Sequence, residues 1–376
     1  MVWRILCVAG ARPNFMKIAP VLRAFARDPR FEARLVHTGQ HYDARLSQVF
    51  FEELAIPRPD IELEVGSGTH AAQTAEVLRR FEPVVEREQP HGVLVVGDVN
   101  STIACALAAS KLVLRAPFRA FGQLRKRPLV IHVEAGLRSR DLDMPEEINR
   151  ILTDAISDVL FVSEPAGMAN LAREGVAAER AILVGNVMID TLVAARDRAA
   201  SSRVLDELGV REAGYALVTL HRPSNVDDVA GLARLLATLD GLGVRLVFPV
   251  HPRTRQRMAA AGLALDPARW VVCEPLGYLD FLRLQAAAQV VFTDSGGVQE
   301  ETTVLGVPCI TLRDNTERPI TCEQGTNQVV GTEPAAIAAA FARIDDVRRA
   351  RRVPDLWDGQ SAERIVAALA QVLAGA

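Results

Sequence analysis

The sequence predicts an α/β protein built from two consecutive, doubly wound parallel sheets. Three observations support this fold class. The chain has 376 residues, of which 49% are hydrophobic, and is therefore too long for one ordinary domain. Short apolar runs of strand type alternate with longer helical patterns, as in parallel βαβ units. Each half of the chain contains its own series of alternating strands and helices, so each half is expected to form its own sheet.

The expected elements follow in order along the chain. The first half should contain strands at Trp3–Ala9, Ala33–His37, Gly92–Val96, Leu129–Val133, Val159–Val162 and Ala181–Val184. The second half should contain strands at Tyr215–Thr219, Arg245–Val250, Trp270–Cys273, Val290–Thr293 and Pro308–Leu312. Helical patterns lie at Pro13–Ala26, Ala71–Arg87, Ser101–Leu114, Ala230–Leu239, Val298–Leu305 and Ser361–Leu373.

We expect a domain boundary near 185–202, where a strand is followed by an Ala- and Arg-rich helix. The N-terminal domain then spans 1–187 and the C-terminal domain 188–358. The last helix, 359–376, has no strand after it and is expected to pack back on the first domain.

Charge and cysteine content exclude several classes of protein. A net charge of −3 and a pI near 6.2 provide no positive electrostatic field that would attract nucleic acid or an anionic membrane. No apolar run approaches a membrane span, and the N-terminal run is too short for a signal peptide. The five cysteines have no C-x-x-C spacing, which suits buried thiols in a reducing compartment, with Cys322 as the exposed exception. We therefore expect a cytoplasmic protein.

The segment 112–128 is unusual because five basic residues alternate with Phe118 and Phe121. The favoured interpretation is a helix extension or a surface excursion with solvated charges. Contact with a membrane surface or a partner is the alternative.

Polar residues follow nearly every expected strand, at the sheet edge where open parallel sheets bind ligands. In the first half these are Arg12 and Lys17 at a helix start, Asp98, Glu134 with Arg138, and Glu146 with Glu147. In the second half they are His221, Arg222, His251, Asp294, the turn Ser295–Gly297, Arg313, Glu317 and Arg318. Glu146 and Glu147 also fit an ordinary acidic first helical turn. Basic residues at helix starts and a glycine turn favour bound phosphate.

Missing motifs narrow the chemistry further. No strand is followed by G-x-G-x-x-G, no P-loop is present, and zinc-type His/Cys spacing is absent. We expect no redox cofactor and no metal. A phosphate-binding site lined by carboxylates and a histidine indicates a nucleotide-activated substrate.

The motifs together resemble one family. They are Gly-Ala-Arg-Pro-Asn-Phe-Met-Lys at 10–17, Gly97-Asp98, His-Val-Glu-Ala-Gly-Leu-Arg at 132–138, Pro-Glu-Glu-Ile-Asn-Arg at 145–150, Gly185-Asn186 with Asp190, Leu-His-Arg at 220–222, Asp-Ser-Gly-Gly-Val-Gln-Glu-Glu at 294–301 and Arg-Asp-Asn-Thr-Glu-Arg-Pro at 313–319. In this order they resemble the bacterial non-hydrolysing UDP-N-acetylglucosamine 2-epimerases. The resemblance implies a GT-B type fold, an active site in the interdomain cleft, a homodimer and a role in polysaccharide biosynthesis.

The resemblance also implies roles for individual residues. The expected catalytic residues are Asp98, Glu134, Glu146 and His221. The expected substrate-binding residues are Arg12, Lys17, Arg138, Arg222, His251, Leu276, Phe281, Ser295, Gly296, Gly297, Glu301 and Arg318. Among them, Glu301 would accept the ribose hydroxyls, and Leu276 and Phe281 would border the uracil. The family reaction eliminates UDP to a 2-acetamidoglucal and adds it back, converting UDP-N-acetylglucosamine to UDP-N-acetylmannosamine.

The chain departs from the family pattern at several places. Ala11 and Asn14 replace the usual Thr and Glu, and Pro223 replaces a second arginine. The segment 40–43 differs from the usual glutamine-rich form, which bears on activation by a second substrate molecule. Other open functions are an epimerase for a UDP-2-acetamido or UDP-2,3-diacetamido sugar, a hydrolysing relative, a GT-B glycosyltransferase, and a silent sugar-nucleotide-binding regulator.

Overall fold

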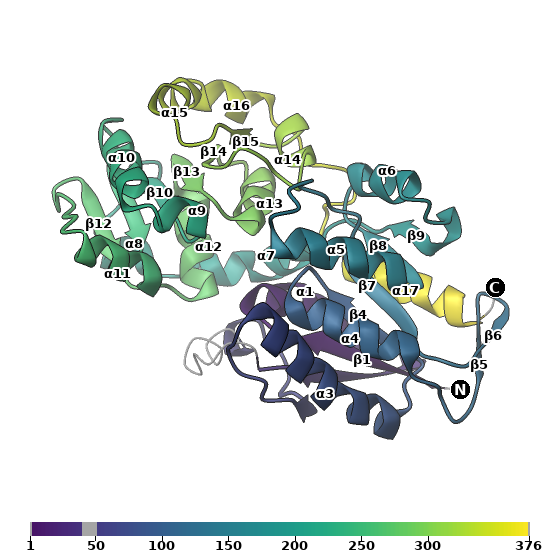
Figure 1. Cartoon of the computed structure of the whole chain (residues 1–376). Helices are drawn as coiled ribbons and strands as arrows, with labels where there is room; N and C mark the ends of the chain where they lie inside the picture. Colours follow the sequence, from purple (N-terminus) through teal and green to yellow (C-terminus); the bar gives the residue numbers. More distant parts are fainter. Residues whose placement is uncertain (1, 40–50, 375–376) are drawn as a thin grey trace. The chain divides into compact units, whose positions relative to one another are not determined.

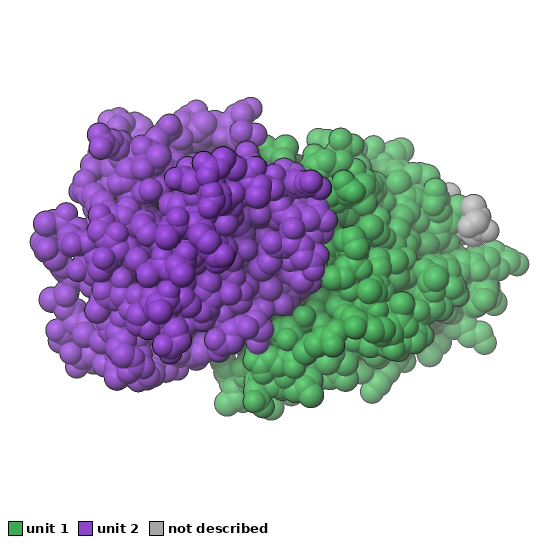
Figure 2. All heavy atoms as spheres, turned by 90° about the horizontal axis from the view of Figure 1, so that it is seen from above, with its two compact units in different colours: residues 1–193, 355–376 green, residues 194–354 purple. Residues whose placement is uncertain are grey.

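The computed structural model describes residues 2–39 and 51–374, except for the side chain of Arg12. The chain divides into two compact units (Figure 2). Unit 1 comprises 1–193 and 355–376, and unit 2 comprises 194–354. The segment 40–43, which the sequence connects with activation, lies outside the described residues.

Unit 1 is a seven-stranded parallel sheet in the order β3-β2-β1-β4-β7-β8-β9 (Figure 1). Its strands are β1 (Trp3–Ala9), β2 (Phe31–His37), β3 (Ile61–Glu62), β4 (Gly92–Val96), β7 (Leu129–Ala135), β8 (Val159–Val162) and β9 (Ala181–Leu183). Its helices are α1 (Arg12–Ala26), α3 (His70–Glu88), α4 (Asn100–Lys111), α5 (Pro145–Ile156), α6 (Pro165–Arg173), the short η1 (Ala178–Arg180), the first part of α7 (Val187–Ala200), and α17 (Ser361–Ala374).

The strand order reverses direction at β1, from which the chain winds first toward β2 and later toward β4 and β7. Because crossovers between parallel strands are right-handed, winding in opposite directions places helices on both faces of the sheet. Helices α3, α4 and α5 pack side by side, while α1 packs against α17. The carboxyl ends of β1, β4 and β7 are neighbours and form the edge from which the candidate site is built.

Unit 2 is a six-stranded parallel sheet in the order β12-β11-β10-β13-β14-β15. Its strands are β10 (Ala216–Thr219), β11 (Leu246–Pro249), β12 (Trp270–Cys273), β13 (Val290–Thr293), β14 (Cys309–Thr311) and β15 (Asn327–Val329). Its helices are α8 (Val204–Glu207), α9 (Pro223–Val226), α10 (Val229–Asp240), α11 (Pro252–Ala260), α12 (Tyr278–Ala287), α13 (Gly296–Leu305), α14 (Ile320–Glu323), α15 (Pro334–Phe341) and α16 (Ile344–Ala350). The predicted fold class, two doubly wound Rossmann-like domains, is confirmed.

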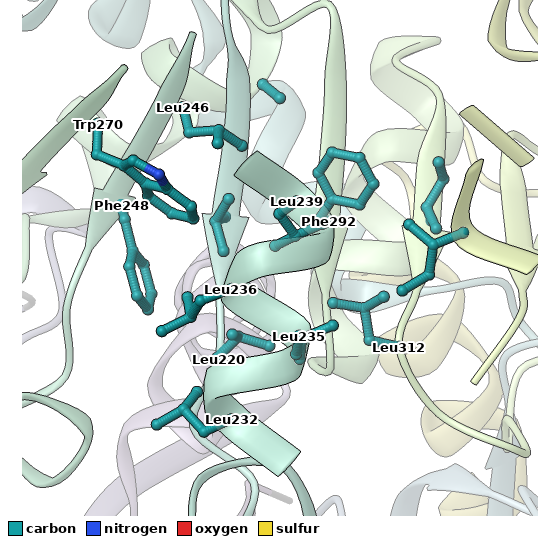
Figure 3. Close-up of a cluster of buried hydrophobic side chains, with 14 of the residues drawn as sticks. Leu220, Leu232, Leu235, Leu236, Leu239, Leu246, Phe248, Trp270, Phe292 and Leu312 are labelled. Carbon is teal, nitrogen blue, oxygen red and sulfur yellow. The ribbon is translucent and has the colours of Figure 1, made fainter. Parts of the chain in front are cut away.

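Helix α10 shows how the pattern in the sequence produces the packing. Its leucines at 232, 235, 236 and 239 follow the i, i+3, i+4, i+7 spacing and are all buried. They pack with Phe248 of β11, Trp270 of β12 and Phe292 of β13 (Figure 3). Burial of such side chains contributes roughly 1.5–3 kcal/mol each.

The basic segment 112–128 forms a small antiparallel hairpin, with β5 (Phe118–Ala120) paired to β6 (Gln123–Arg125). Helix α4 therefore ends at Lys111, three residues before the predicted end, because Leu112 already has an extended backbone. Phe118 is buried, and the backbone N–H of Phe121 donates to Val372 of α17. The segment is thus a surface excursion that is hydrogen-bonded to the last helix of its own unit.

Helix α17 is held in unit 1 by its first turn. The carboxylate of Asp190, on α7, accepts the backbone N–H groups of Ser361 at 3.1 Å and Ala362 at 2.7 Å. Two donors that a helix start leaves unpaired are satisfied in this way. The indole of Trp357 donates to the carbonyl of Ser163 just before this turn.

Two further expectations can be compared with the fold. Cys7, Cys105 and Cys309 are buried free thiols, and Cys322 is exposed, as the sequence predicted. Within residues 2–39 and 51–374, no helix is both long and apolar enough to cross a membrane.

Candidate active site

The loop after β1 is organised by Asn14, at the third position of α1. Its Oδ1 accepts the backbone N–H groups of Gly10 and Ala11, and its Nδ2 donates to the carbonyl of Val96 at 2.9 Å. A glutamate could accept the first two bonds but could not donate the third. Asn14 therefore joins the carboxyl ends of β1 and β4, which gives its departure from the family pattern a structural reason.

Lys17, one turn further along α1, forms a buried ion pair with Glu134 at the end of β7. The Lys17 Nζ lies 2.7 Å from both carboxylate oxygens, and the two side chains are only 7% and 3% exposed. Gly97 has a positive φ, and a Cβ at this position would lie 2.9 Å from the Lys17 Nζ. A side chain at Gly97 would therefore displace the Lys17 ammonium, and the positive φ also favours glycine here.

Glu134 lies in an unusual backbone conformation. Its φ is +73°, and the register between β7 and β8 shifts at this residue. A non-glycine residue with positive φ costs about 1–3 kcal/mol and persists only where surrounding contacts hold it. The resulting bulge turns the Glu134 side chain back toward Lys17, instead of leaving it in the alternation of the strand.

Asp98, at the end of β4, is held by Arg150 of α5. The guanidinium donates to Asp98 Oδ2 from Nε at 3.0 Å and from a terminal nitrogen at 2.7 Å. Arg150 also bonds to Glu147, a fully buried carboxylate that accepts the backbone N–H groups of Ser139 and Arg140. Glu147 therefore shapes the loop before α5, while the side chain of Asp98 stays 21% exposed and reachable.

Glu146 begins the same helix and is half-buried. Among the described residues, its carboxylate has no hydrogen-bond or ion-pair partner in the chain. Glu146, Arg150 and Asp154 are spaced by four residues and therefore lie on one face of α5. The helix thus presents the candidate acid and two anchoring side chains from the same side.

Arg138 is not open to a ligand in the same way. Its guanidinium is 4% exposed and pairs with Asp154 at 2.8 Å and with Glu174 at 2.6 Å. Its predicted contact with substrate stays a prediction.

In unit 2 the candidate catalytic residue is His221, two residues after the end of β10. Its Nδ1 lies 2.8 Å from Asp294, while the ring is half exposed. Asp294 is fully buried and also accepts the backbone N–H groups of His221 and Arg222 and the amide of Asn225. Burial alone would raise the pKa of Asp294, but the hydrogen bond and charge of His221 and the backbone donors hold it below its ordinary value. The imidazole is therefore fixed through one nitrogen, with the other available.

The turn Ser295–Gly297 opens α13 at the end of β13 and is flanked by cations. Arg318 bonds to Glu317 and Glu300 at 2.6 Å each. A Cβ on Gly296 would lie 2.6 Å from a terminal nitrogen of Arg318 and 2.8 Å from Glu317. A helix start beside a guanidinium is chemically suited to an anion, so the binding of phosphate here stays a prediction.

Glu301 lies one turn along α13 and is buried. It accepts the hydroxyl of Tyr278 at 2.9 Å and, with the amide of Gln285 turned toward it, a second bond at 3.0 Å. Burial raises the pKa of Glu301 to about 7, with repulsion from Glu300 adding to the rise and the Tyr278 and Gln285 bonds opposing it. Leu276 and Phe281 are partly buried against the neighbouring hydrophobic cluster.

Two other predicted residues lie at strand ends of unit 2. Arg222 donates from Nε to the carbonyl of Asp294 and stays partly exposed. His251 is exposed, and its Nδ1 accepts the N–H of Arg253 as the N-cap of α11. The side chain of Arg12 lies outside the described residues.

The structure thus shows one group of predicted residues in each unit. Unit 1 holds Asp98, Glu134, Glu146 and Lys17 at one sheet edge, and unit 2 holds His221, Ser295, Gly296, Gly297, Glu301 and Arg318 at another. Sequence reasoning named Asp294 and the motif that contains Arg150 without assigning them an anchoring role, and it missed the anchoring partners Asp154 and Tyr278. The four-residue spacing from Glu146 could have indicated the roles of Arg150 and Asp154. Among the described residues, no group of three or more His, Cys, Asp or Glu is placed to hold a metal ion.

The fold and these groups define a class, the GT-B type proteins with two Rossmann-like units and polar residues at the carboxyl ends of their strands. The particular family follows from comparison with known proteins: the UDP-N-acetylglucosamine 2-epimerase profile matches residues 23–370. The chain belongs to this family, whose members are isomerases.

Individual relatives agree with this assignment. The UDP-N-acetylglucosamine 2-epimerase of the archaeon Methanocaldococcus jannaschii is 39% identical, over 96% of this chain and 98% of the relative. A UDP-2,3-diacetamido-2,3-dideoxy-D-glucuronate 2-epimerase of Pseudomonas aeruginosa is 42% identical, over 87% and 88%. The solved structure of the M. jannaschii UDP-GlcNAc 2-epimerase in complex with UDP-GlcNAc and UDP matches with a TM-score of 0.86 and 38% identity, covering 98% and 99%.

Proposed function

We propose that this chain interconverts UDP-N-acetylglucosamine and UDP-N-acetylmannosamine without hydrolysis, by eliminating UDP and adding it back. The observation that carries the proposal is the Lys17–Glu134 pair beside Asp98, in a chain of this family. The cation comes from α1, and the two carboxylates lie at the ends of the adjacent strands β4 and β7. The reaction needs both kinds of charge.

The chemistry explains why several acids are needed. The C2 proton of the sugar has no adjacent carbonyl to acidify it, so a base removes it as the C1–O bond to UDP breaks. The product of this step is 2-acetamidoglucal and UDP. In the return step the C1–O bond re-forms while a proton is delivered to the opposite face of C2, which requires a second group. Asp98, Glu134 and Glu146 are the candidates, with His221 from unit 2.

UDP would be held mainly by unit 2. The N-terminus of α13 and Arg318 would take the diphosphate charge, which grows as the C1–O bond breaks. Glu301 would accept the ribose hydroxyls, and Leu276 and Phe281 would border the uracil. Lys17 supports this proposal from unit 1, because its ammonium has three donors and pairs with Glu134 at the end of β7. We propose that residues of both groups bind the substrate, with Arg12, Arg138, Arg222 and His251 contributing to its binding.

The N-acetyl sugar is favoured, and one observation keeps a second substrate in view. The diacetamido sugar acid 2-epimerase of P. aeruginosa is as similar to the chain as the archaeal UDP-N-acetylglucosamine enzyme. Both substrates share the UDP group and the C2 proton and differ at C3 and C6. The same two groups of residues would serve either reaction.

The test is incubation of the purified protein with UDP-N-acetylglucosamine in deuterated water, without nicotinamide or added metal. We expect UDP-N-acetylmannosamine carrying deuterium at C2, measured by proton NMR and mass spectrometry. Product without deuterium would contradict elimination. Release of free UDP and N-acetylmannosamine would indicate a hydrolysing enzyme. If only the UDP-diacetamido sugar acid is converted in a parallel incubation, that sugar and not UDP-N-acetylglucosamine is the substrate.

The remaining expectations concern the state of the protein. We propose a cytoplasmic homodimer of the bacterial non-hydrolysing type. The free thiols support a reducing compartment, and the family resemblance supports the dimer. Light scattering coupled to gel filtration would test the dimer, and a mass near 41 kDa, that of the 40.8 kDa chain, would contradict it.

A further inference from the structure

The acids of unit 1 are connected by a buried network that the reaction does not itself use. His132 lies on β7 two residues before Glu134 and is fully buried. Its Nε2 lies 2.8 Å from the carbonyl of Gly97, and its Nδ1 lies 2.6 Å from Asp154. Because a carbonyl only accepts, Nε2 carries a hydrogen and donates to Gly97, the residue before Asp98.

Asp154 completes the connection from α5. Its second oxygen accepts the backbone N–H of Gly136 at 3.0 Å and pairs with Arg138 at 2.8 Å. One carboxylate therefore binds residues on both sides of Glu134, namely His132 and Gly136. Burial opposes ionisation of Asp154, but His132 and Arg138 outweigh it and hold its pKa below the ordinary value.

The backbone between His132 and Gly136 has a conformation that must be stabilised by its surroundings. Glu134 has a φ of +73° at a register shift, a conformation that only surrounding contacts maintain. Gly136 also packs closely against α6, because a Cβ at this position would lie 2.5 Å from the carbonyl oxygen of Gly167. The bonds of Asp154 fix the ends of the bulge, and the bond from His132 fixes the backbone that carries Asp98.

We propose that Asp154 and His132 are positioning residues that hold Glu134 and Asp98 in register for proton transfer at C2. This inference rests on the proposed function. A misplacement of about 1 Å in a reacting group can lower a rate roughly 100-fold without weakening ligand binding. Asp154 and His132 would act on the two acids through the backbone that carries them.

The chain offers a matched control at the opposite end of β7. Asp158 is 8% exposed, accepts the backbone N–H of Val130 at 2.9 Å and pairs with Arg127 at 2.7 Å. It resembles Asp154 in burial, in its bond to a backbone N–H and in its arginine. It differs in holding the amino end of the strand, away from the acids.

The test compares Asp154→Asn, His132→Gln and Asp158→Asn with the unchanged protein. We expect Asp154→Asn to lower kcat about 10- to 100-fold with KM within about threefold, since the residues of unit 2 proposed to hold UDP are untouched and Arg138 keeps its ion pair with Glu174. We expect Asp158→Asn to lower Tm by about as much as Asp154→Asn does, while kcat stays within about threefold of that of the unchanged protein. Equal losses of kcat in Asp154→Asn and Asp158→Asn at equal Tm would overturn the proposal. If Asp154→Asn does not fold, His132→Gln, which retains side-chain donors, is judged by the same comparison.

A measurement that needs no activity separates this inference from the proposed function. Hydrogen exchange of the peptide covering 132–138 should accelerate at least about tenfold in Asp154→Asn and stay unchanged in Asp158→Asn. Unchanged exchange in Asp154→Asn would overturn the positioning role even if the enzyme epimerises. Conversely, an inactive wild-type protein with the expected exchange pattern would contradict the proposed function alone.

Discussion

The Nδ1 of His221 lies 2.8 Å from the carboxylate of Asp294, which is completely buried while the imidazole is half exposed. The ring is therefore oriented by a group that a ligand cannot reach, and its Nε2 is on the accessible side. This relationship separates the proposed role of His221 in chemistry from the role of Asp294 in structure.

Replacing His221 by Asn is expected to lower kcat about 100-fold, because a positioned proton-transfer group contributes roughly 10²–10⁴. The free energy of unfolding should fall by about 1–3 kcal/mol, since the buried Asp294 loses one partner but keeps three other donors. Steady-state kinetics and urea denaturation measure the two effects. Asp294→Asn is the comparison and should lose roughly 3–5 kcal/mol, because it disrupts a buried group with several donors. A His221→Asn enzyme with unchanged kcat would exclude the histidine from the chemistry.

Replacing Lys17 by Met is expected to destabilise unit 1 by roughly 3–5 kcal/mol, because Glu134 would be left buried without its cation. Adding Glu134→Gln to this variant should restore most of the stability, since the uncompensated charge is then removed. Epimerase activity should stay lost in both proteins. Denaturant titration and the deuterium incorporation assay provide the measurements. The 2.7 Å contacts indicate that the two side chains depend on one another. A double variant no more stable than Lys17→Met would contradict this dependence.

The stability of the protein should depend on pH through Glu301. Its folded pKa is raised to about 7 from an ordinary 4.5, so the folded state binds the proton more tightly than the unfolded state. The resulting destabilisation is absent below about pH 4, grows as pH rises and is complete above about pH 7. It amounts to roughly 3 kcal/mol at an order-of-magnitude level.

Glu301→Gln should remove this dependence, because glutamine has no proton to lose. We therefore expect the variant to be more stable than the unchanged protein at pH 8 and similar to it at pH 4, by urea denaturation at both values. An equal difference at pH 4 and pH 8 would show that Glu301 does not titrate in this range. UDP binding, measured in parallel by calorimetry, should weaken if Glu301 holds the ribose.

Replacing Asp190 by Ala should destabilise the docking of α17 by about 0.5–2 kcal/mol, the usual cost of losing a helix N-cap. Asp190→Asn is the matched control, since asparagine can still accept from the first turn. Thermal unfolding should rank Asp190→Ala below Asp190→Asn. Equal Tm values for these two variants would indicate that the bonds to Ser361 and Ala362 contribute nothing measurable.

Much of the fold could be predicted because strand and helix patterns are local. The expected strands Trp3–Ala9, Gly92–Val96, Val159–Val162, Trp270–Cys273 and Val290–Thr293 have the observed bounds. The short strands β3 and β15 and the hairpin of β5 and β6 were missed. They contain only two or three residues each, which is too few for a periodic signal, and their pairing depends on distant partners.

The sequence by itself determined that two doubly wound sheets form and that polar side chains follow their strands, because periodicity and strand ends are local properties. Only the tertiary structure decided how these side chains are paired. Lys17 meets Glu134 and Arg150 meets Asp98 because β1, β4 and β7 are neighbours, although these partners are 117 and 52 residues apart in the chain. The positive φ of Glu134 likewise depends on Asp154 and His132 holding the bulge, a constraint that no local pattern encodes.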